Sequence, residues 1–182
     1  MKTVVVFRDH HERKLKQEYS NKAHVDYILL CLYTYLPPLR GSEYLNCKYS
    51  LGPHTVDNIA QFSNNLLDIA NHCFWMQHYK TVKEHGIRRI EIPDMLYNIL
   101  MEYYNRYHFE YLLGKLISPA LLASRFNNIF GCKISVNMLR KIYVSEKVNE
   151  MTVKERKVLA FIMAHNLETQ EMIYHRFGQN HS

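Results

Sequence analysis

The chain has 182 residues, 47% of them hydrophobic, and a formal net charge of +6 at pH 7. This length and apolar content are enough for one buried core, so we expect a folded domain. No apolar run reaches the roughly 18 residues of a transmembrane helix, and the first residues do not resemble a secretory signal, so neither a membrane protein nor a secreted one is expected. The basic charge favours partners that carry phosphate, although it is compatible with many folds.

Four cysteines, Cys31, Cys47, Cys73 and Cys132, are far apart in the sequence and form no CxxC motif. This spacing is unlike that of a zinc site or a disulfide framework. We therefore expect buried free thiols in an intracellular, reducing compartment such as the cytoplasm, the nucleus or a virus factory.

The first third of the chain combines a charged start with an apolar helix. Residues 1–20 are highly charged, and we expect a strand followed by a loose arm, with one domain from residue 21 to 182. Apolar residues recur at helical spacing from about Lys22 to Leu36, and Pro37-Pro38 must end that helix. A short strand is expected at 43–48.

The middle of the chain is β-prone and then helical. Strands are expected at 66–69, 73–79 and 87–92, with His85-Gly86 as the turn between the last two. Pro93-Asp94 starts a helix, with Asp94 as its cap. The side chains expected on the inner face of that helix are Met95, Ile99, Leu100 and Tyr103.

Capping residues mark the later helices. Ser118-Pro119 opens a helix that Gly131 ends, and Ser135 caps the next one. The spacing of Thr152 and Glu155 is that of a capping box, opening a helix to Ala164, and a last helix is expected from about Glu168. The fold class predicted from these elements is α+β: mostly helical, with a small antiparallel sheet or hairpin.

Five side chains could together hold a phosphodiester and attack it: Arg40, Lys80, Arg140, His165 and Tyr174. Each has a simpler interpretation. Arg40 can be solvated beyond its helix, Arg140 can form a surface salt bridge, and Lys80 can be an ordinary hairpin lysine. With eleven histidines and fourteen tyrosines in the chain, neither His165 nor Tyr174 means much alone.

The order and spacing of these residues resemble the catalytic domain of the tyrosine recombinases, the phage-integrase-like family that shares its core with type IB topoisomerases. The phrase Leu36-Pro-Pro-Leu-Arg40 matches the family's first arginine, and Lys80-Thr81 matches its hairpin lysine. Asn137-Met-Leu-Arg140 matches the His-x-x-Arg box, and Ala164-His165 stands before Tyr174 at the family's nine-residue spacing. The proline-rich phrase is similar to the branch found in large DNA viruses, virophages and related mobile elements.

The resemblance implies that residues 21–182 form a domain that breaks and rejoins double-stranded DNA through a covalent 3′-phosphotyrosyl intermediate. Tyr174 would attack the phosphorus, Arg40 and Arg140 would clamp the non-bridging oxygens, and Lys80 would protonate the leaving 5′-oxygen. No metal or cofactor is implied. Self-association into a dimer or tetramer on DNA is expected. Two alternatives stay open: DNA relaxation in the manner of a type IB topoisomerase, and a catalytically silent DNA-binding module.

Two positions depart from the family pattern. Asn137 replaces the first histidine of the box; its amide can donate a hydrogen bond to phosphate but cannot shuttle a proton, a role left to His165. Ala164 replaces the usual glycine. The family's usual N-terminal core-binding domain also has no counterpart in this sequence, so we expect either a fragment of a longer integrase or a minimal enzyme.

Basic residues near the expected site are candidate phosphate contacts, although any one of them can equally be a solvated surface charge. They are Lys141, Lys147, Lys154 and Lys157. Without a core-binding domain, we expect weak and strongly salt-dependent DNA binding.

Overall fold

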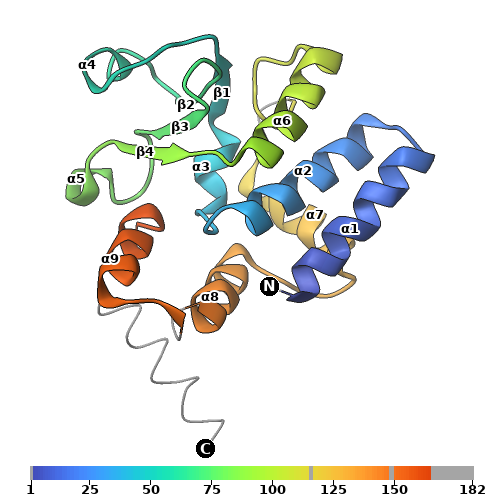
Figure 1. Cartoon of the computed structure of the whole chain (residues 1–182). Helices are drawn as coiled ribbons and strands as arrows, with labels where there is room; N and C mark the ends of the chain where they lie inside the picture. Colours follow the sequence, from blue (N-terminus) through green and yellow to red (C-terminus); the bar gives the residue numbers. More distant parts are fainter. Residues whose placement is uncertain (1, 115–116, 148–149, 165–182) are drawn as a thin grey trace, which may run out of the picture.

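A computed structural model describes residues 2–114, 117–147 and 150–164 (Figure 1). Two long helices, α1 (Lys2–Gln17) and α2 (Asn21–Tyr35), lie side by side, and a small sheet stands at the other side of the molecule. Helix α2 forms the centre of the core, because its side chains from Ile28 to Tyr33 are all inaccessible to solvent. Its start is capped by the Ser20 hydroxyl, which accepts a hydrogen bond from the Ala23 amide at 3.2 Å.

The prediction of a strand and a loose arm for residues 1–20 is wrong. The run Val4-Val5-Val6 favours a strand by local propensity, but the segment is the helix α1. Val4 and Leu15 become buried in the main core, and α1 packs along α2. Tertiary burial of an apolar face therefore outweighs propensity here. The boundary proposed between residues 20 and 21 stays a prediction.

The connection after α2 follows the prediction in its main feature. The helix ends at Tyr35, and Pro37-Pro38 prevents its continuation. Arg40 then stands at the N-cap position of the short helix α3 (Gly41–Leu45), without a capping bond from its side chain, and α3 leads into β1 (Cys47–Ser50). The strand expected at 43–48 is thus displaced: Glu43 lies in α3, and pairing with the sheet begins only at Cys47.

The sheet has the order β1-β2-β3-β4, with β2 at Asn65–Asp68, β3 at Cys73–Met76 and β4 at Arg88–Glu91. The pairs β2–β3 and β3–β4 are antiparallel as expected, whereas β1 and β2 run parallel, with the short helix α4 (Val56–Ile59) between them. Helix α5 (Val82–His85) lies in the β3–β4 connection. His85-Gly86 is therefore not a tight hairpin turn; Gly86, at φ 67°, ends α5.

Four further helices complete the described fold: α6 (Asp94–Tyr107), α7 (Pro119–Phe130), α8 (Val136–Lys147) and α9 (Val153–Ile162). The predicted starts of the last three are confirmed, because the hydroxyls of Ser118, Ser135 and Thr152 each accept a hydrogen bond from the amide three residues on. The Glu155 carboxylate accepts from the Thr152 amide in return, which completes the capping box.

Two details of these helices differ from prediction. The cap of α6 is Pro93 rather than Asp94, and Leu96 is buried beside Leu100 and Tyr103, whereas Met95 is 60% exposed. The end of α9 also comes earlier than predicted: the helix stops at Ile162, and Ala164 adopts a left-handed conformation at φ 49°. The last predicted helix lies outside the described residues.

The four cysteines are free thiols. Cys31, Cys47 and Cys73 are buried as expected, but Cys132 is exposed just after α7. Within the described ranges, no helix has both the length and the hydropathy needed to cross a bilayer.

Candidate active site

Three arginines from distant parts of the chain converge on the C-terminal end of α9. Arg88 donates to the carbonyl of Ile162, Arg140 to that of Met163 at 2.6 Å, and Arg40 to that of Ala164 at 3.3 Å. The last carbonyls of a helix have no partner within the helix and carry partial negative charge, so cationic donors are favoured there. The contacts place three guanidinium groups on three consecutive peptide units.

Arg40 reaches this point because the proline-rich connection ends its helix and the α3 helix starts just after it. Its side chain is half-buried, and Nη1 also donates to the Thr81 hydroxyl at 3.2 Å. That contact brings the β3–β4 connection to Arg40. The neighbouring residue, Lys80, is exposed. The structure therefore places the backbone of the predicted general acid near the first predicted arginine.

Arg140 is buried, with 2% of its surface exposed, which rules out the interpretation as a surface salt bridge. Its Nη1 donates to the Pro38 carbonyl at 3.3 Å, so α8 is joined to the connection that carries Arg40. Burial, and after it the positive charge of Arg40, lowers the pKa of Arg140 to about 10. The group is still protonated at neutral pH, and an anion would relieve both effects.

Arg88 was not predicted as a site residue. It is fully buried with Glu43, and its Nη2 lies 3.1 Å from the Glu43 carboxylate. The contact is close enough for an ion pair but is not aligned as a hydrogen bond, so we treat the attraction as Coulombic. Burial raises the pKa of Glu43, and the charge of Arg88 opposes that shift. The guanidinium also lies 3.8 Å from the centre of the Tyr79 ring.

The alternation of side chains along a β-strand would have predicted that Arg88 is buried. Side chains alternate between the two faces of a strand, and Ile90 and Ile92 are both apolar. A face that holds these two residues also holds Arg88, whereas Arg89 and Glu91 point outward, as their exposure shows. In the sequence alone, Arg88 and Arg89 look like two of several charges on a hairpin.

The remaining predicted residues are placed only in part. Asn137 lies in the first turn of α8, one turn before Arg140, and its side chain is exposed. His165 and Tyr174 lie outside the described residues. His165 nevertheless follows Ala164 directly in the chain, and the Ala164 carbonyl is held by Arg40. Arg40 and Arg140 therefore reach adjacent carbonyls, while the roles of all six residues stay predictions.

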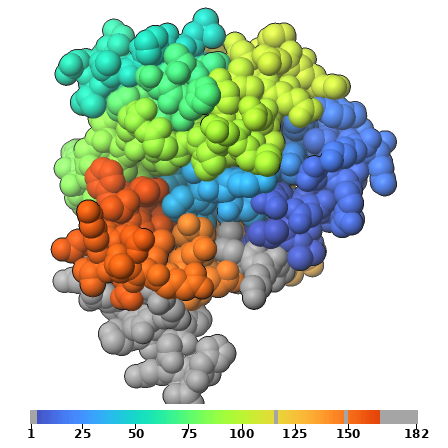
Figure 2. All heavy atoms as spheres, viewed as in Figure 1, coloured from blue at the N-terminus to red at the C-terminus, as the bar shows by residue number. Residues whose placement is uncertain are grey.

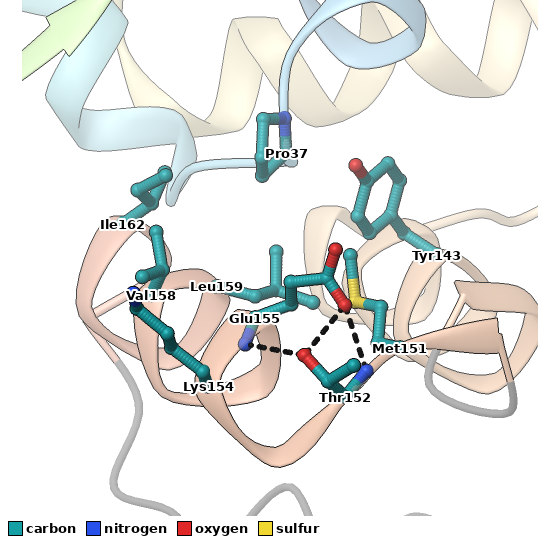
Figure 3. A pocket seen from close by; sticks show the side chains of 9 residues that line it. All are labelled: Pro37, Tyr143, Met151, Thr152, Lys154, Glu155, Val158, Leu159 and Ile162. Atoms are coloured by element: carbon teal, nitrogen blue, oxygen red, sulfur yellow. Dashed lines mark hydrogen bonds between the residues drawn. The ribbon is translucent and has the colours of Figure 1, made fainter.

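A pocket of about 500 Å³ lies between α8, α9 and Pro37 (Figure 3). Most of its lining is apolar, and Figure 3 shows the Thr152–Glu155 capping box at one side. Figure 2 shows the α8 and α9 surfaces gathered below the sheet. The residues lining the pocket are Pro37, Tyr143, Met151, Thr152, Lys154, Glu155, Val158, Leu159 and Ile162. Within the described ranges, no group of three or more histidine, cysteine or acidic side chains is placed to hold a metal ion.

The fold matches a solved structure, that of XerA recombinase. The TM-score is 0.60 at 11% sequence identity, and the match covers 97% of this chain. The chain spans 62% of the length of XerA recombinase. No model of a protein family and no curated protein sequence matches the chain. The α+β fold of tyrosine recombinase type expected from the sequence is thereby confirmed.

Proposed function

We propose that the chain is the catalytic domain of a site-specific DNA recombinase or integrase, which cleaves and rejoins DNA through a covalent 3′-phosphotyrosyl intermediate. One observation carries the proposal: Arg40 and Arg140, a hundred positions apart in the sequence, converge on adjacent carbonyls at the end of α9. With Arg88, three guanidinium groups gather there around one buried carboxylate, that of Glu43. Two guanidinium groups held as close together as those of Arg40 and Arg140 suit a phosphodiester. The fold of XerA recombinase supports the same conclusion.

The two arginines would act on the transition state. As the phosphorus becomes pentacoordinate, negative charge collects on its non-bridging oxygens, and guanidinium forks match pairs of such oxygens. In the DNA-free protein these donors hold the carbonyls of Met163 and Ala164 instead. A charged phosphate forms stronger hydrogen bonds than a peptide carbonyl, so bound DNA would displace at least one of the two.

The covalent step would exchange one ester for another. The Tyr174 oxygen bonds to phosphorus as it loses its proton, and the bond to the 5′-oxygen breaks. Lys80, on the exposed connection beside Arg40, would give that oxygen its proton. His165 would carry a proton and donate a hydrogen bond, and Asn137 would only donate. Because the ester energy is retained, a 5′-hydroxyl can reverse the step, and no metal or cofactor is required by this scheme.

The partners in this proposal are double-stranded DNA and further copies of the chain, which strand exchange between two duplexes would bring together. Exposed lysines on α8 and α9 would contact the phosphate backbone: Lys141, Lys147, Lys154 and Lys157. The narrower assignment to a viral or mobile element, acting in an intracellular and reducing compartment, rests on the phrase Leu36-Pro-Pro-Leu-Arg40 and on the free thiols.

Covalent trapping tests the proposal. The protein is incubated, with EDTA present, with a pool of nicked and gapped duplexes of varied sequence, and adducts are resolved on denaturing gels. We expect an adduct with the wild type and none with Tyr174→Phe. Tyr104→Phe, which makes the same chemical change on α6, is the matched control and should retain the adduct. Sequencing of the captured DNA would give the target site.

Other outcomes would redirect the assignment. An adduct that survives in Tyr174→Phe would contradict the proposed nucleophile. Relaxation of supercoiled DNA without any joining of separate duplexes would favour the topoisomerase activity. Salt-sensitive DNA binding with no adduct would favour a silent binding module, and Asn137→His would then test whether the missing histidine is the cause.

A further inference from the structure

Arg88 has a position that the proposed chemistry does not use. Its side chain is wholly inaccessible to solvent, and the proposed chemistry gives it no contact with DNA. Its described contacts go to three separate segments, each next to a different member of the proposed catalytic set. Figure 1 shows β4, the α5 connection and the end of α9 grouped on one side of the molecule.

The first contact leads to Arg40. The partner carboxylate belongs to Glu43, three residues after Arg40 in the short helix α3, and both side chains are completely buried. The attraction between the two charges fixes α3 against β4, because two opposite charges in a poorly solvated interior interact strongly.

The second contact leads to Lys80. The guanidinium of Arg88 lies over the ring of Tyr79, the residue before Lys80, at 3.8 Å from the ring centre. The Tyr79 hydroxyl also donates to the Gly86 carbonyl at the far end of α5. The base of the connection that carries Lys80 is thus held at both of its ends.

The third contact leads to His165. Arg88 donates to the carbonyl of Ile162, the last residue of α9 and three positions before His165. The Arg88 side chain therefore joins the segments that carry Arg40 and Lys80 to the end of α9. Apolar side chains of similar volume in place of both Arg88 and Glu43 could fill this space with little loss of stability, but they would make none of these contacts.

We infer that Arg88 is a positioning residue for DNA cleavage, which sets the mutual placement of the arginine, lysine and histidine segments without contacting DNA. This inference rests on the proposed function. It differs from a role in folding alone, because removal of both charges should lower the cleavage rate even where the fold and its stability are kept.

The decisive variant is the double substitution Glu43→Leu/Arg88→Met, which exchanges the buried ion pair for apolar side chains. Its matched control is Asp26→Leu/Arg125→Met, which removes the ion pair between α2 and α7. Single-turnover cleavage at saturating DNA, DNA affinity, thermal midpoint and hydrogen exchange are measured for both. We expect the Glu43/Arg88 variant to cleave at least tenfold more slowly, with unchanged DNA affinity, and to exchange faster at residues 79–86 and 159–164. The control should retain the wild-type cleavage rate.

A wild-type cleavage rate in the Glu43/Arg88 variant would overturn the inference, as would an equal loss in the control. If the double variant does not fold, Arg88→Lys provides the test. It keeps the charge but loses the planar group that lies on the Tyr79 ring, and it should cleave at least threefold more slowly at unchanged affinity. A wild-type rate in Arg88→Lys would then overturn the inference. Absence of cleavage by the wild type itself would refute the proposed function instead, and hydrogen exchange would still report on whether Arg88 holds the three segments.

Discussion

Two ion pairs of the molecule differ in what surrounds them. Arg125 of α7 and Asp26 of α2 lie 2.6 Å apart and keep 17% and 15% of their side chains exposed. Arg88 and Glu43 lie 3.1 Å apart and are completely buried. In the first pair the two charges neutralise each other and are partly solvated, so no further charged group is needed to compensate them.

The second pair has two more arginines beside it, because the charges of Arg140 and Arg40 also lower the pKa of Glu43. Desolvated charges of one sign destabilise a folded protein unless something compensates them. The comparison teaches that a stability role accounts for the α2–α7 pair but not for the arginine group at α9. Under the function proposed above, that group would bind the phosphate of DNA.

The largest expected effect is on stability. Arg88→Ala should lower the free energy of unfolding by about 3–5 kcal/mol, because it removes the ion-pair partner of the completely buried Glu43 carboxylate. Arg125→Ala should lower it by only about 1 kcal/mol, since water reaches Asp26. Urea unfolding of both variants measures the difference. Equal losses would mean that the two pairs are energetically alike and would remove the basis of the comparison.

The next effect concerns catalysis. Arg140→Ala should slow single-turnover cleavage by roughly 100- to 1,000-fold, the usual loss when one preorganised donor to a developing charge is removed. Arg125→Ala is the control and should cleave at the wild-type rate. Circular dichroism would verify that both proteins fold. Undiminished cleavage by Arg140→Ala would show that Arg140 does not take part in the cleavage reaction.

A smaller effect is expected from a buried histidine. His24 is buried against the Tyr103 ring and contacts the Tyr19 hydroxyl at 3.2 Å, and burial lowers its pKa. A lowered pKa in the folded state gives stability that is present above about pH 6.5 and is lost as the pH falls through the folded value, by at most about 1.4 kcal/mol per pH unit. Unfolding should be measured between about pH 5 and pH 8, because histidine titrates in this range. The free energy of unfolding should show this slope.

The control for that slope is a pair of histidine substitutions. His24→Gln should flatten the dependence of stability on pH below pH ~6.5, whereas His10→Gln, on the exposed face of α1, should leave it in place. An unchanged slope in His24→Gln would assign the acid sensitivity to another group.

The smallest effect is on DNA binding. Lys157 is exposed on α9, and Lys157→Ala should reduce the slope of log K against log salt by about one if the side chain neutralises one phosphate. Lys16→Ala, on α1 at the other side of the molecule, should leave the slope unchanged. A loss in Lys16→Ala equal to that in Lys157→Ala would indicate nonspecific attraction to the whole basic surface.

Local signals were sufficient for the starts of α7, α8 and α9. Ser118 and Thr152 cap their helices through bonds to the third residue on, a geometry that a few neighbouring residues determine. The N-terminal helix could not be predicted in this way, because Val4 is stabilised by α2 rather than by its neighbours in sequence. The arginine group was predictable in part: the resemblance found Arg40 and Arg140, but no sequence pattern indicated that the end of α9 would be their common acceptor.

Ala164, beside the arginine group, has a strained backbone conformation. A non-glycine residue at φ 49° is held in a conformation that costs about 1 kcal/mol, and here the hydrogen bond from Arg40 holds its carbonyl. A phosphate that takes this donor, as the proposed function requires, would remove one of the contacts that the alanine backbone makes in this conformation; the other is the hydrogen bond from its amide to the Phe161 carbonyl. Glycine at this position, as in the family that the sequence resembles, would adopt the same conformation without strain. Loss of the hydrogen bond from Arg40 would then relieve no backbone strain.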